Sequence, residues 1–277
     1  MMKIGVMVES FRAGLAGGLQ AAKELGADGV QLSVSGQATE SELAEIKSQL
    51  DDSGLELAAV CADFGGHGFM VADENPARIE RSKKAVDEAL ALGTNVVTTH
   101  IGVVPHDKSA PRYKVMAEAC EQLARYARSA GAWFAIETGP EKGPLLRSFI
   151  DDIDIEQGLG VNFDPANLVM IVRDDIPSAV EALGPFIVHT HAKDGNNLRE
   201  LDPEVTYGAV PCPEGAEQWS GFEEVPLGEG SVPWPEYLAA LKRVGYDGYL
   251  TIEREVGDNP RADIELAVKF LKDLLAR

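Results

Sequence analysis

The stretch FIVHTHAKDG, residues 186–195, is an apolar run that ends at a histidine and is followed by Lys-Asp-Gly. It is one of eight similar runs along the chain, and a helical pattern follows each of them. The runs are nearly continuously hydrophobic, which is typical of parallel strands that are covered on both faces. The eight predicted strands are KIGVMV (3–8), GVQLSV (29–34), LELAAVCA (55–62), NVVTTHIG (95–102), WFAIET (133–138), LGVNFD (159–164), FIVHTH (186–191) and YLTIER (249–254).

Amphipathic segments lie between these strands. Thr39 or Ser41 is a suitable N-cap for one helix, and Asn75-Pro76 is a cap followed by proline in the first turn of another. A glycine precedes several strands, and we expect it to end the preceding helix in the left-handed conformation. The clearest helical segments cover residues 39–54, 75–93, 112–131 and 258–277, and the glycines are Gly26, Gly54, Gly93, Gly131, Gly184 and Gly245.

The alternation of strand and helix predicts a parallel sheet with right-handed crossovers. Eight strand–helix units in 277 residues favour a (β/α)8 TIM barrel of the α/β class. A doubly wound open sheet is the alternative, but no GxGxxG motif follows the first strand. No linker or low-complexity tract marks a second domain, so we expect a single domain over residues 1–277.

Residues 195–231 break the pattern, because they are rich in Gly, Pro and Glu and have weak helical periodicity. A connection of this length is usually functional or disordered. It follows the strand at 186–191 directly and therefore lies over the C-terminal mouth of the predicted barrel. We interpret it as a lid or substrate loop, in which Trp219 could stack on a sugar; disorder is the alternative.

The chain carries 45 acidic and 25 basic residues, which gives a formal net charge of −20. Such a surface disfavours nucleic acid and anionic membranes as partners. The three cysteines form no CxxC pair and are odd in number, which fits a reducing compartment. We expect no signal peptide and no transmembrane helix, and hence a cytoplasmic protein.

Polar residues stand at the ends of the predicted strands, where the active sites of such barrels lie. Several are acidic, and buried carboxylates that converge on one axis repel each other unless a cation lies between them. The residues are Glu9, Cys61, Asp63, His100, Glu137, Asp164, His191 and Glu253.

Four of them, on the fifth to eighth strands, form a candidate metal site: Glu137, Asp164, His191 and Glu253. Three carboxylates and one imidazole suit a divalent ion such as Mn²⁺, Zn²⁺, Co²⁺ or Mg²⁺. His189 lies two residues before His191 and shares its face of the strand, one layer deeper, so we interpret it as structural.

The motifs IETGP (136–140), NFDPANL (162–168), HTHAKDG (189–195) and PLGEGSVPWPEYLAALKRVGYDGYLTIERE (226–255) resemble the xylose isomerase-like TIM-barrel superfamily. This superfamily includes sugar phosphate isomerases and epimerases, ketose 3-epimerases, inosose dehydratases and endonuclease IV. The resemblance covers nearly the whole chain.

The resemblance implies that Glu137, Asp164, His191 and Glu253 bind one divalent metal ion. It also implies that Glu137 and Glu253 act as acid and base. The metal would hold a substrate carbonyl and the neighbouring hydroxyl and stabilise an enediolate. One glutamate would remove a proton from the α-carbon and the other would return one.

The sequence departs from two branches of the superfamily at Asn167. Endonuclease IV, which binds three zinc ions, has a histidine there and an Asp-x-His pair after strand seven, but no histidine follows His191. Ketose 3-epimerases commonly have a substrate-contacting histidine at the same position. The nucleic-acid function is therefore disfavoured, and Asn167 stands where a substrate contact is expected.

Further residues are candidates for substrate binding. His100 either hydrogen-bonds substrate or is structural. His67, in the Gly-rich loop after strand three, either closes over the site or is a surface histidine. Lys193 could contact a substrate oxygen or neutralise Glu137 and Asp164, and Glu224 borders the predicted lid. Arg254 points away from Glu253 if the strand alternates, so we interpret it as structural.

The sequence thus predicts a metal-dependent isomerase or epimerase that acts on a small keto or aldo sugar or a derivative. A lyase of the same superfamily, such as an inosose-type dehydratase or an enzyme that cleaves oxidised glycosides, is the alternative. A non-catalytic sugar- or metal-binding barrel is more remote. The identity of the sugar, its phosphorylation and any homo-oligomeric state stay open.

Overall fold

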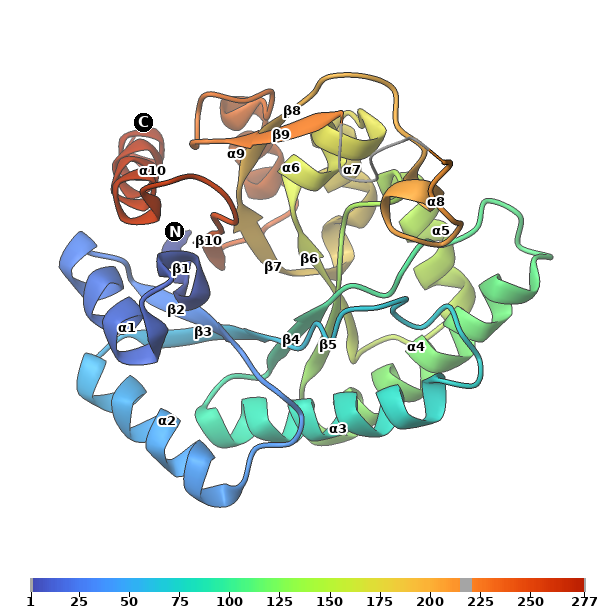
Figure 1. The fold of residues 1–277 in the computed structure, drawn as a ribbon, viewed down its shortest axis with the longest axis horizontal. Coiled ribbons are helices and arrows are strands. Elements are labelled where there is room, and N and C mark those ends of the chain that lie inside the picture. The colour runs from blue at the N-terminus through green and yellow to red at the C-terminus, as the bar shows by residue number, and fades with distance from the viewer. Residues whose placement is uncertain (1, 215–220, 277) are drawn as a thin grey trace.

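The structure, a computed structural model, describes residues 2–214 and 221–276; Trp219 lies outside them. Eight parallel strands close into a barrel in the order β1-β10-β7-β6-β5-β4-β3-β2, and helices surround it (Figure 1). The barrel strands are β1 (Lys3–Met7), β2 (Gly29–Ser33), β3 (Glu56–Cys61), β4 (Val96–Thr99), β5 (Trp133–Glu137), β6 (Leu159–Phe163), β7 (Ile187–Ala192) and β10 (Tyr249–Ile252). The predicted TIM barrel and all eight predicted strands are confirmed.

The long helices agree with the predicted segments. Thr39 caps α2 in a capping box with Glu42, in which each side chain bonds the backbone N–H of the other residue. The helices are α1 (Gly14–Leu25), α2 (Glu40–Ser53), α3 (Asn75–Leu92), α4 (Pro111–Ala130), α5 (Gly143–Ile153), α6 (Pro165–Asn167), α7 (Ile176–Leu183), α8 (Pro203–Thr206), α9 (Trp234–Arg243) and α10 (Pro260–Leu275), with short 3-10 or π turns at Val8–Phe11, Leu168–Val172 and Gly184–Phe186. No helix in the described part of the chain has both the length and the apolar character needed to cross a membrane.

Two predicted helix ends are wrong. Asn75 is the first residue inside α3 rather than its cap, and its side-chain amide donates to the Phe69 carbonyl at 3.1 Å. Gly184 has a right-handed backbone (φ −44°) instead of a left-handed one. A Cβ on Gly184 would lie 2.7 Å from the Val244 side chain, so glycine serves close packing there. The other five glycines have positive φ, as predicted.

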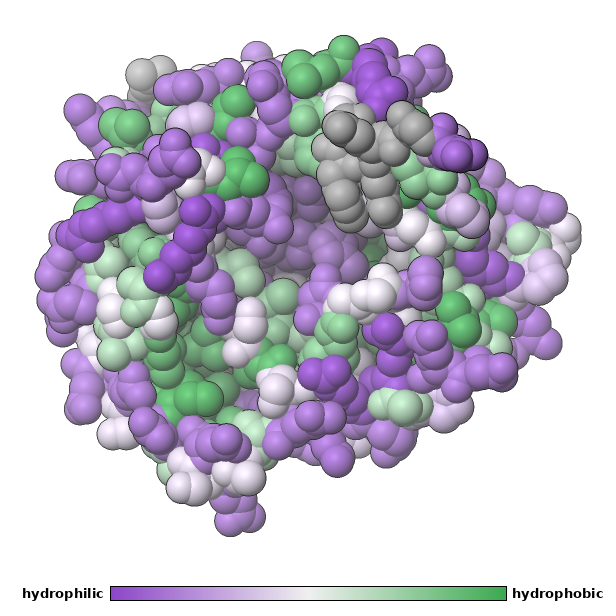
Figure 2. Space-filling model, viewed as in Figure 1, coloured by the Kyte–Doolittle hydropathy of each residue, from purple (hydrophilic) through white to green (hydrophobic). Residues whose placement is uncertain are grey.

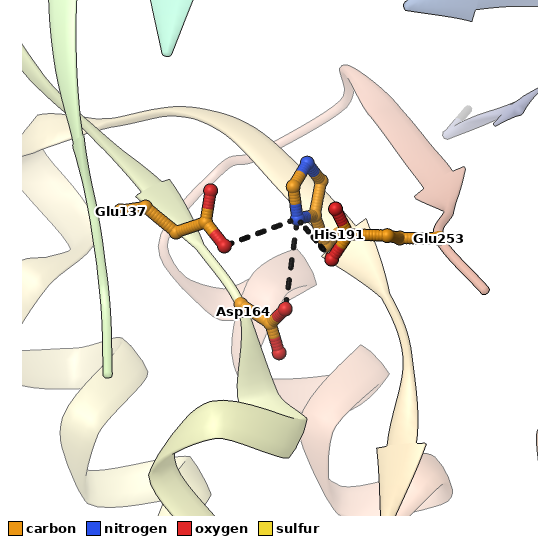
Figure 3. Close-up of side chains that lie close together, drawn as sticks. All are labelled: Glu137, Asp164, His191 and Glu253. Atoms are coloured by element: carbon orange, nitrogen blue, oxygen red, sulfur yellow. Dashed lines mark ion pairs between the residues drawn. The ribbon is translucent and has the colours of Figure 1, made fainter. Parts of the chain in front are cut away.

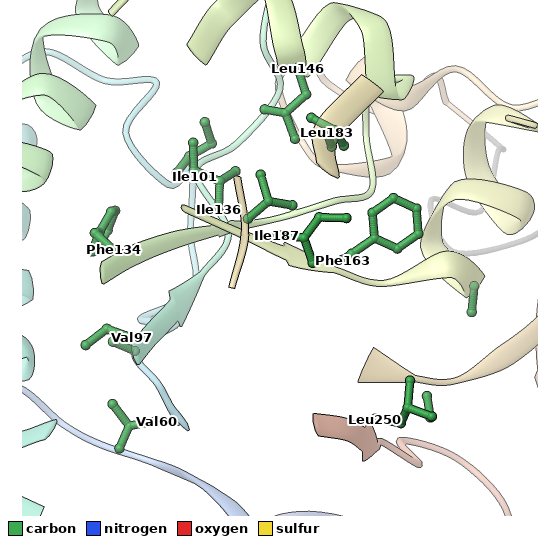
Figure 4. Close-up of a cluster of buried hydrophobic side chains, with 14 of the residues drawn as sticks. Val60, Val97, Ile101, Phe134, Ile136, Leu146, Phe163, Leu183, Ile187 and Leu250 are labelled. Carbon is green, nitrogen blue, oxygen red and sulfur yellow. The ribbon is translucent and has the colours of Figure 1, made fainter. Parts of the chain in front are cut away.

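Alternation along the strands separates the two faces of the barrel wall. On β5, Phe134 and Ile136 point outward into the apolar layer beneath the helices (Figure 4), whereas Ala135 belongs to a small cluster of its own. Glu137 ends the same strand two residues after Ala135 and therefore shares its face. The helices pack against the outward apolar layer. Polar groups such as Glu137 can therefore lie on the opposite face of the strand.

The segment 195–231 contains regular structure that the sequence did not predict. β8 (Asp194–Asn197) and β9 (Phe222–Val225) pair as an antiparallel hairpin, and α8 lies between them in sequence. The two strands read DGNN and FEEV, and their polar residues have low strand propensity. The pairing is a long-range contact that local patterns do not reveal.

Asp194 anchors this segment to the end of β7. Its buried carboxylate accepts four hydrogen bonds, from the backbone N–H groups of Gly195, Gly228 and Val232 and from the Trp234 indole, at 2.8–3.1 Å. Such charge-assisted bonds are stronger than neutral ones. Both ends of the segment are therefore held at one point beside the barrel mouth.

Candidate metal centre

Four side chains converge at the C-terminal ends of neighbouring strands β5, β6, β7 and β10 (Figure 3). The ring nitrogen Nδ1 of His191 lies 3.5 Å from a Glu137 oxygen, 3.5 Å from an Asp164 oxygen and 3.3 Å from a Glu253 oxygen. Each of the four residues offers a ligand atom within 4.8 Å of the others. The structure therefore brings together the four residues that the sequence singled out.

Two atoms at the centre of this cluster fit a cation. His191 Nδ1 and Asp164 Oδ2 are buried, and neither has a hydrogen-bond partner among the described residues. Buried polar atoms in proteins are nearly always paired, so unpaired ones require an explanation. A divalent ion coordinated by both atoms and by the two glutamates would supply the missing partner.

The electrostatics of the cluster favour a positive charge at the same point. Burial alone would lower the pKa of His191, but the charges of Glu253 and Glu137 raise it well above its ordinary value. Burial would raise the pKa of Glu253, yet Lys193 and His191 hold it well below the usual range. Glu253 thus stays ionised, and the cluster attracts a cation, either a proton on Nδ1 or a metal ion.

Gln31 orients His191, and sequence reasoning missed it. Its side-chain oxygen lies 3.0 Å from Nε2 of His191 and 3.0 Å from Nε2 of His189, and its amide donates to Thr98 at 2.9 Å. An acceptor at that place favours a proton on Nε2, which leaves the Nδ1 lone pair toward the carboxylates. His189 is buried behind the cluster and shares this acceptor.

Two asparagines hold the Glu137 carboxylate. Asn162, which was not predicted, donates to one oxygen at 3.0 Å, and Asn167 donates to the other at 3.2 Å. The Asn167 backbone N–H also donates to Asp164 at 3.0 Å. Asn167 lines the neighbouring cavity as well, so the candidate substrate residue also touches two candidate ligands.

A cavity of about 1,230 Å³ opens beside the cluster, and Figure 2 shows this face hollowed near its centre. Glu137 and Glu253 line it, so both are accessible to a small molecule that enters. Phe222 of β9 and Tyr207, the residue that follows α8, contribute to its wall. The cavity also contains every predicted substrate-binding residue: His67, His100, Asn167, Lys193 and Glu224.

The contacts of these residues differ. His100 Nε2 lies 3.5 Å from Glu137, whereas Lys193 Nζ lies 3.0 Å from Glu253 and also pairs with Glu255. Glu224 pairs with Arg254 at 2.6 Å.

Arg254 also bonds Asp263 at 2.8 Å, so its side chain connects β9 to α10. Cys61 and Asp63 line the cavity, whereas Glu9 is not among its lining residues and accepts a hydrogen bond from the Ser33 N–H at 2.7 Å.

Comparisons with known proteins agree with this architecture. A family model described as xylose isomerase-like TIM barrel matches residues 19–274. A curated relative, the uncharacterized protein MJ1311 of Methanocaldococcus jannaschii, is 26% identical over 204 residues, which are 66% of this chain and 62% of that protein. The chain thus matches less than two thirds of that relative's length.

Two solved structures share the fold along nearly the whole chain. A xylose isomerase domain protein from Planctomyces limnophilus superimposes with a TM-score of 0.80 at 26% identity and covers 99% of this chain and 96% of its own. A D-tagatose 3-epimerase-like protein superimposes with a TM-score of 0.74 at 21% identity and covers 99% of each chain.

Proposed function

Because the chain belongs to the xylose isomerase-like TIM barrel family, we propose that it is a divalent-metal-dependent enzyme that isomerises or epimerises a small keto or aldo sugar or a derivative. One observation carries the proposal: three carboxylates and His191 converge beside a large cavity, and two of their buried atoms have no hydrogen-bond partner among the described residues. Acidic residues on a protein surface need not converge in this way. In a purely structural ion pair, we expect the buried polar atoms to be hydrogen-bonded.

Glu137, Asp164, His191 and Glu253 would hold one ion. When bound, the ion would supply positive charge that stabilises the negative charge developing on substrate oxygens. The neutral Nε2–H tautomer of His191, favoured by Gln31, keeps its Nδ1 lone pair available for coordination. Asn162 and Asn167 restrain Glu137, so its carboxylate is oriented before substrate arrives.

Glu137 and Glu253 would carry out the proton transfers. Both line the cavity, and the cationic neighbours of each outweigh burial and lower its pKa. Each is therefore ionised near neutral pH and ready to accept a proton from the carbon next to the substrate carbonyl. The other glutamate, once it has taken up a proton from solvent, returns that proton to the opposite face of the carbon for epimerisation. For isomerisation a proton returns to the adjacent carbon, and a hydroxyl proton moves between the two neighbouring oxygens.

The first test is the metal content of the purified protein and of His191→Ala after mild dialysis. We expect about one divalent ion per chain in the wild type, none in His191→Ala, and no change in His106→Ala, which removes an exposed histidine. A wild type that neither retains nor binds a divalent ion would contradict the proposal. About three zinc ions per chain would point to the endonuclease branch instead.

A panel of ketoses and aldoses, incubated with the metal-loaded protein in deuterium oxide, tests the chemistry. Proton removal and return predicts an isomeric product that carries deuterium at the reacting carbon. A product that has lost water or a glycosidic leaving group would assign the lyase reaction instead, because the same proton removal can expel a β-substituent. No turnover combined with tight sugar binding would indicate the non-catalytic alternative.

A further inference from the structure

The described wall of the cavity is acidic. Its lining includes one lysine, Lys193, and no arginine. The undescribed residues 215–220, GAEQWS, contain Glu217 and neither lysine nor arginine. Against this single cation stand six lining carboxylates: Asp63, Glu137, Glu223, Glu224, Glu253 and Glu255.

Lys193 does not offer a free positive charge to a ligand. Its side chain is buried, with 4% exposed, and its ammonium group lies 3.0 Å from Glu253 and pairs also with Glu255. An ammonium group has three N–H donors, so these two carboxylates occupy most of its capacity. Two negative partners also compensate its charge.

A guanidinium group beside the cavity is engaged in the same way. Arg254, which lies behind the wall, pairs with Glu224 at 2.6 Å and with Asp263 at 2.8 Å. In the Gly-rich loop at the opposite wall, the Asp63 carboxylate accepts the Gly65 N–H at 2.7 Å. An amide that could have bound an anion there already has an acidic partner.

The balance of charge decides which ligands the cavity accepts. A divalent ion in the cluster, Lys193 and Arg254 together do not neutralise the carboxylates around the cavity, and Asp63 and Glu223 pair with no cation among the described residues. A phosphate group carries about 1.5–2 negative charges at neutral pH. It would enter a negative potential in which no lysine or arginine of the described lining is free to bind it.

The remaining wall suits an uncharged sugar. Met170, Ile171, Tyr207 and Phe222 provide apolar and aromatic surface, against which the carbon face of a sugar ring can pack. The carboxylates provide hydrogen-bond acceptors for hydroxyl groups. Both features favour a neutral polyhydroxy compound over an anionic one.

We infer that the cavity selects an uncharged carbohydrate and rejects phosphorylated or carboxylated ones, and that Glu255 sets this selectivity by holding Lys193. The inference rests on the proposed function for the location of the substrate. Glu255 suits the role because it stands at the rim with 61% of its side chain exposed, while its partner Lys193 lies inside. Removal of its charge leaves Lys193 paired with Glu253 alone and frees an N–H donor toward the cavity.

The experiment compares binding of D-glucitol and D-glucitol 6-phosphate to the metal-loaded protein by calorimetry. The wild type should bind glucitol more tightly than its phosphate, or fail to bind the phosphate. Glu255→Gln should bind the phosphate about 10- to 100-fold more tightly than the wild type, as a released charge-assisted hydrogen bond provides. Glu223→Gln removes the same charge from the rim without releasing Lys193, so it should change phosphate binding by less than about threefold.

Each result decides the inference. A wild type that binds the phosphate as tightly as glucitol overturns the selectivity, and a Glu255→Gln variant that gains no more than Glu223→Gln overturns the role of Glu255. Chemical unfolding of both variants confirms that they are folded. The proposed function fails separately, through absent turnover of any sugar by the metal-loaded protein, and that result does not change the measured ratio of the two dissociation constants.

Discussion

Gln31→Leu is the sharpest test of how the fold prepares the metal site. Gln31 is fully buried on β2, and its side-chain oxygen is the shared acceptor for Nε2 of His189 and of His191, each at 3.0 Å. Leucine has a similar size but no acceptor. The substitution therefore leaves two buried ring N–H groups unpaired and removes the contact that fixes the His191 tautomer.

The expected magnitudes follow from these contacts. Each buried donor without a partner costs about 1–3 kcal/mol, so the metal-free protein should lose about 2–6 kcal/mol of unfolding free energy. Loss of the partner that orients a ligating histidine typically weakens metal binding about 10- to 100-fold. We expect the dissociation constant for Mn²⁺ to rise by that factor, because the Nδ1 lone pair of His191 is no longer held toward the carboxylates.

The assay is calorimetric titration of the chelator-stripped protein with Mn²⁺, together with denaturant unfolding of the metal-free form. Thr98→Val is the matched control, since it removes the acceptor of the Gln31 amide at 2.9 Å but leaves both histidine contacts. Its metal affinity should stay closer to that of the wild type than the affinity of Gln31→Leu. A folded Gln31→Leu protein that binds Mn²⁺ with the wild-type dissociation constant would refute the reasoning.

Three further outcomes are expected. Burial raises the pKa of Glu141 to about 8 from 4.5, so the folded state retains a proton that the unfolded chain releases, and stability falls as pH rises between these values. In denaturant unfolding, the unfolding free energy of Glu141→Gln should exceed that of the wild type by a few kcal/mol at pH 8.5 and match it near pH 4.5. An equal difference at both pH values would contradict this. Gly230→Ala should lose about 1–3 kcal/mol of unfolding free energy, because a Cβ would overlap the Asp194 carboxylate. Unchanged thermal unfolding would show that the Asp194 carboxylate can move aside without loss of stability. Glu137→Gln and Glu253→Gln should each lower turnover about 100- to 10,000-fold in the product assay, and near-normal turnover in either would remove that residue from the proton transfer.

The barrel itself could be predicted because its signals are local. Each strand is a short apolar run, and each of the long helices carries its own amphipathic pattern and an end signal such as the Thr39 capping box. The predicted helix end at Gly184 was wrong because a residue distant in sequence determines why glycine stands there. Gly184 resembles a helix-ending glycine in sequence, but the Val244 side chain on the neighbouring segment is what excludes a larger residue.

The four-residue cluster could be predicted for a related reason. Parallel strands of a barrel end at the same rim, so Glu137, Asp164, His191 and Glu253 converge once the strands are assigned. Gln31 and Asn162 lie inside strands rather than at their ends, and an internal polar residue carries no local mark of its partner. Gln31 is separated from His191 by 160 residues in sequence, so only the closed barrel reveals that they touch.

The hairpin and the candidate metal site share one physical support, at the end of β10. Glu253 turns toward the cluster, whereas the next residue, Arg254, bonds Glu224 of β9 and Asp263 of α10. Because successive side chains of an extended chain point to opposite sides, one pair of residues fixes the ligand and the wall of the cavity together. A displacement of β9 would therefore move Arg254, the residue next to Glu253. By linkage, an ion that orders Glu253 also stabilises the hairpin that lines the cavity.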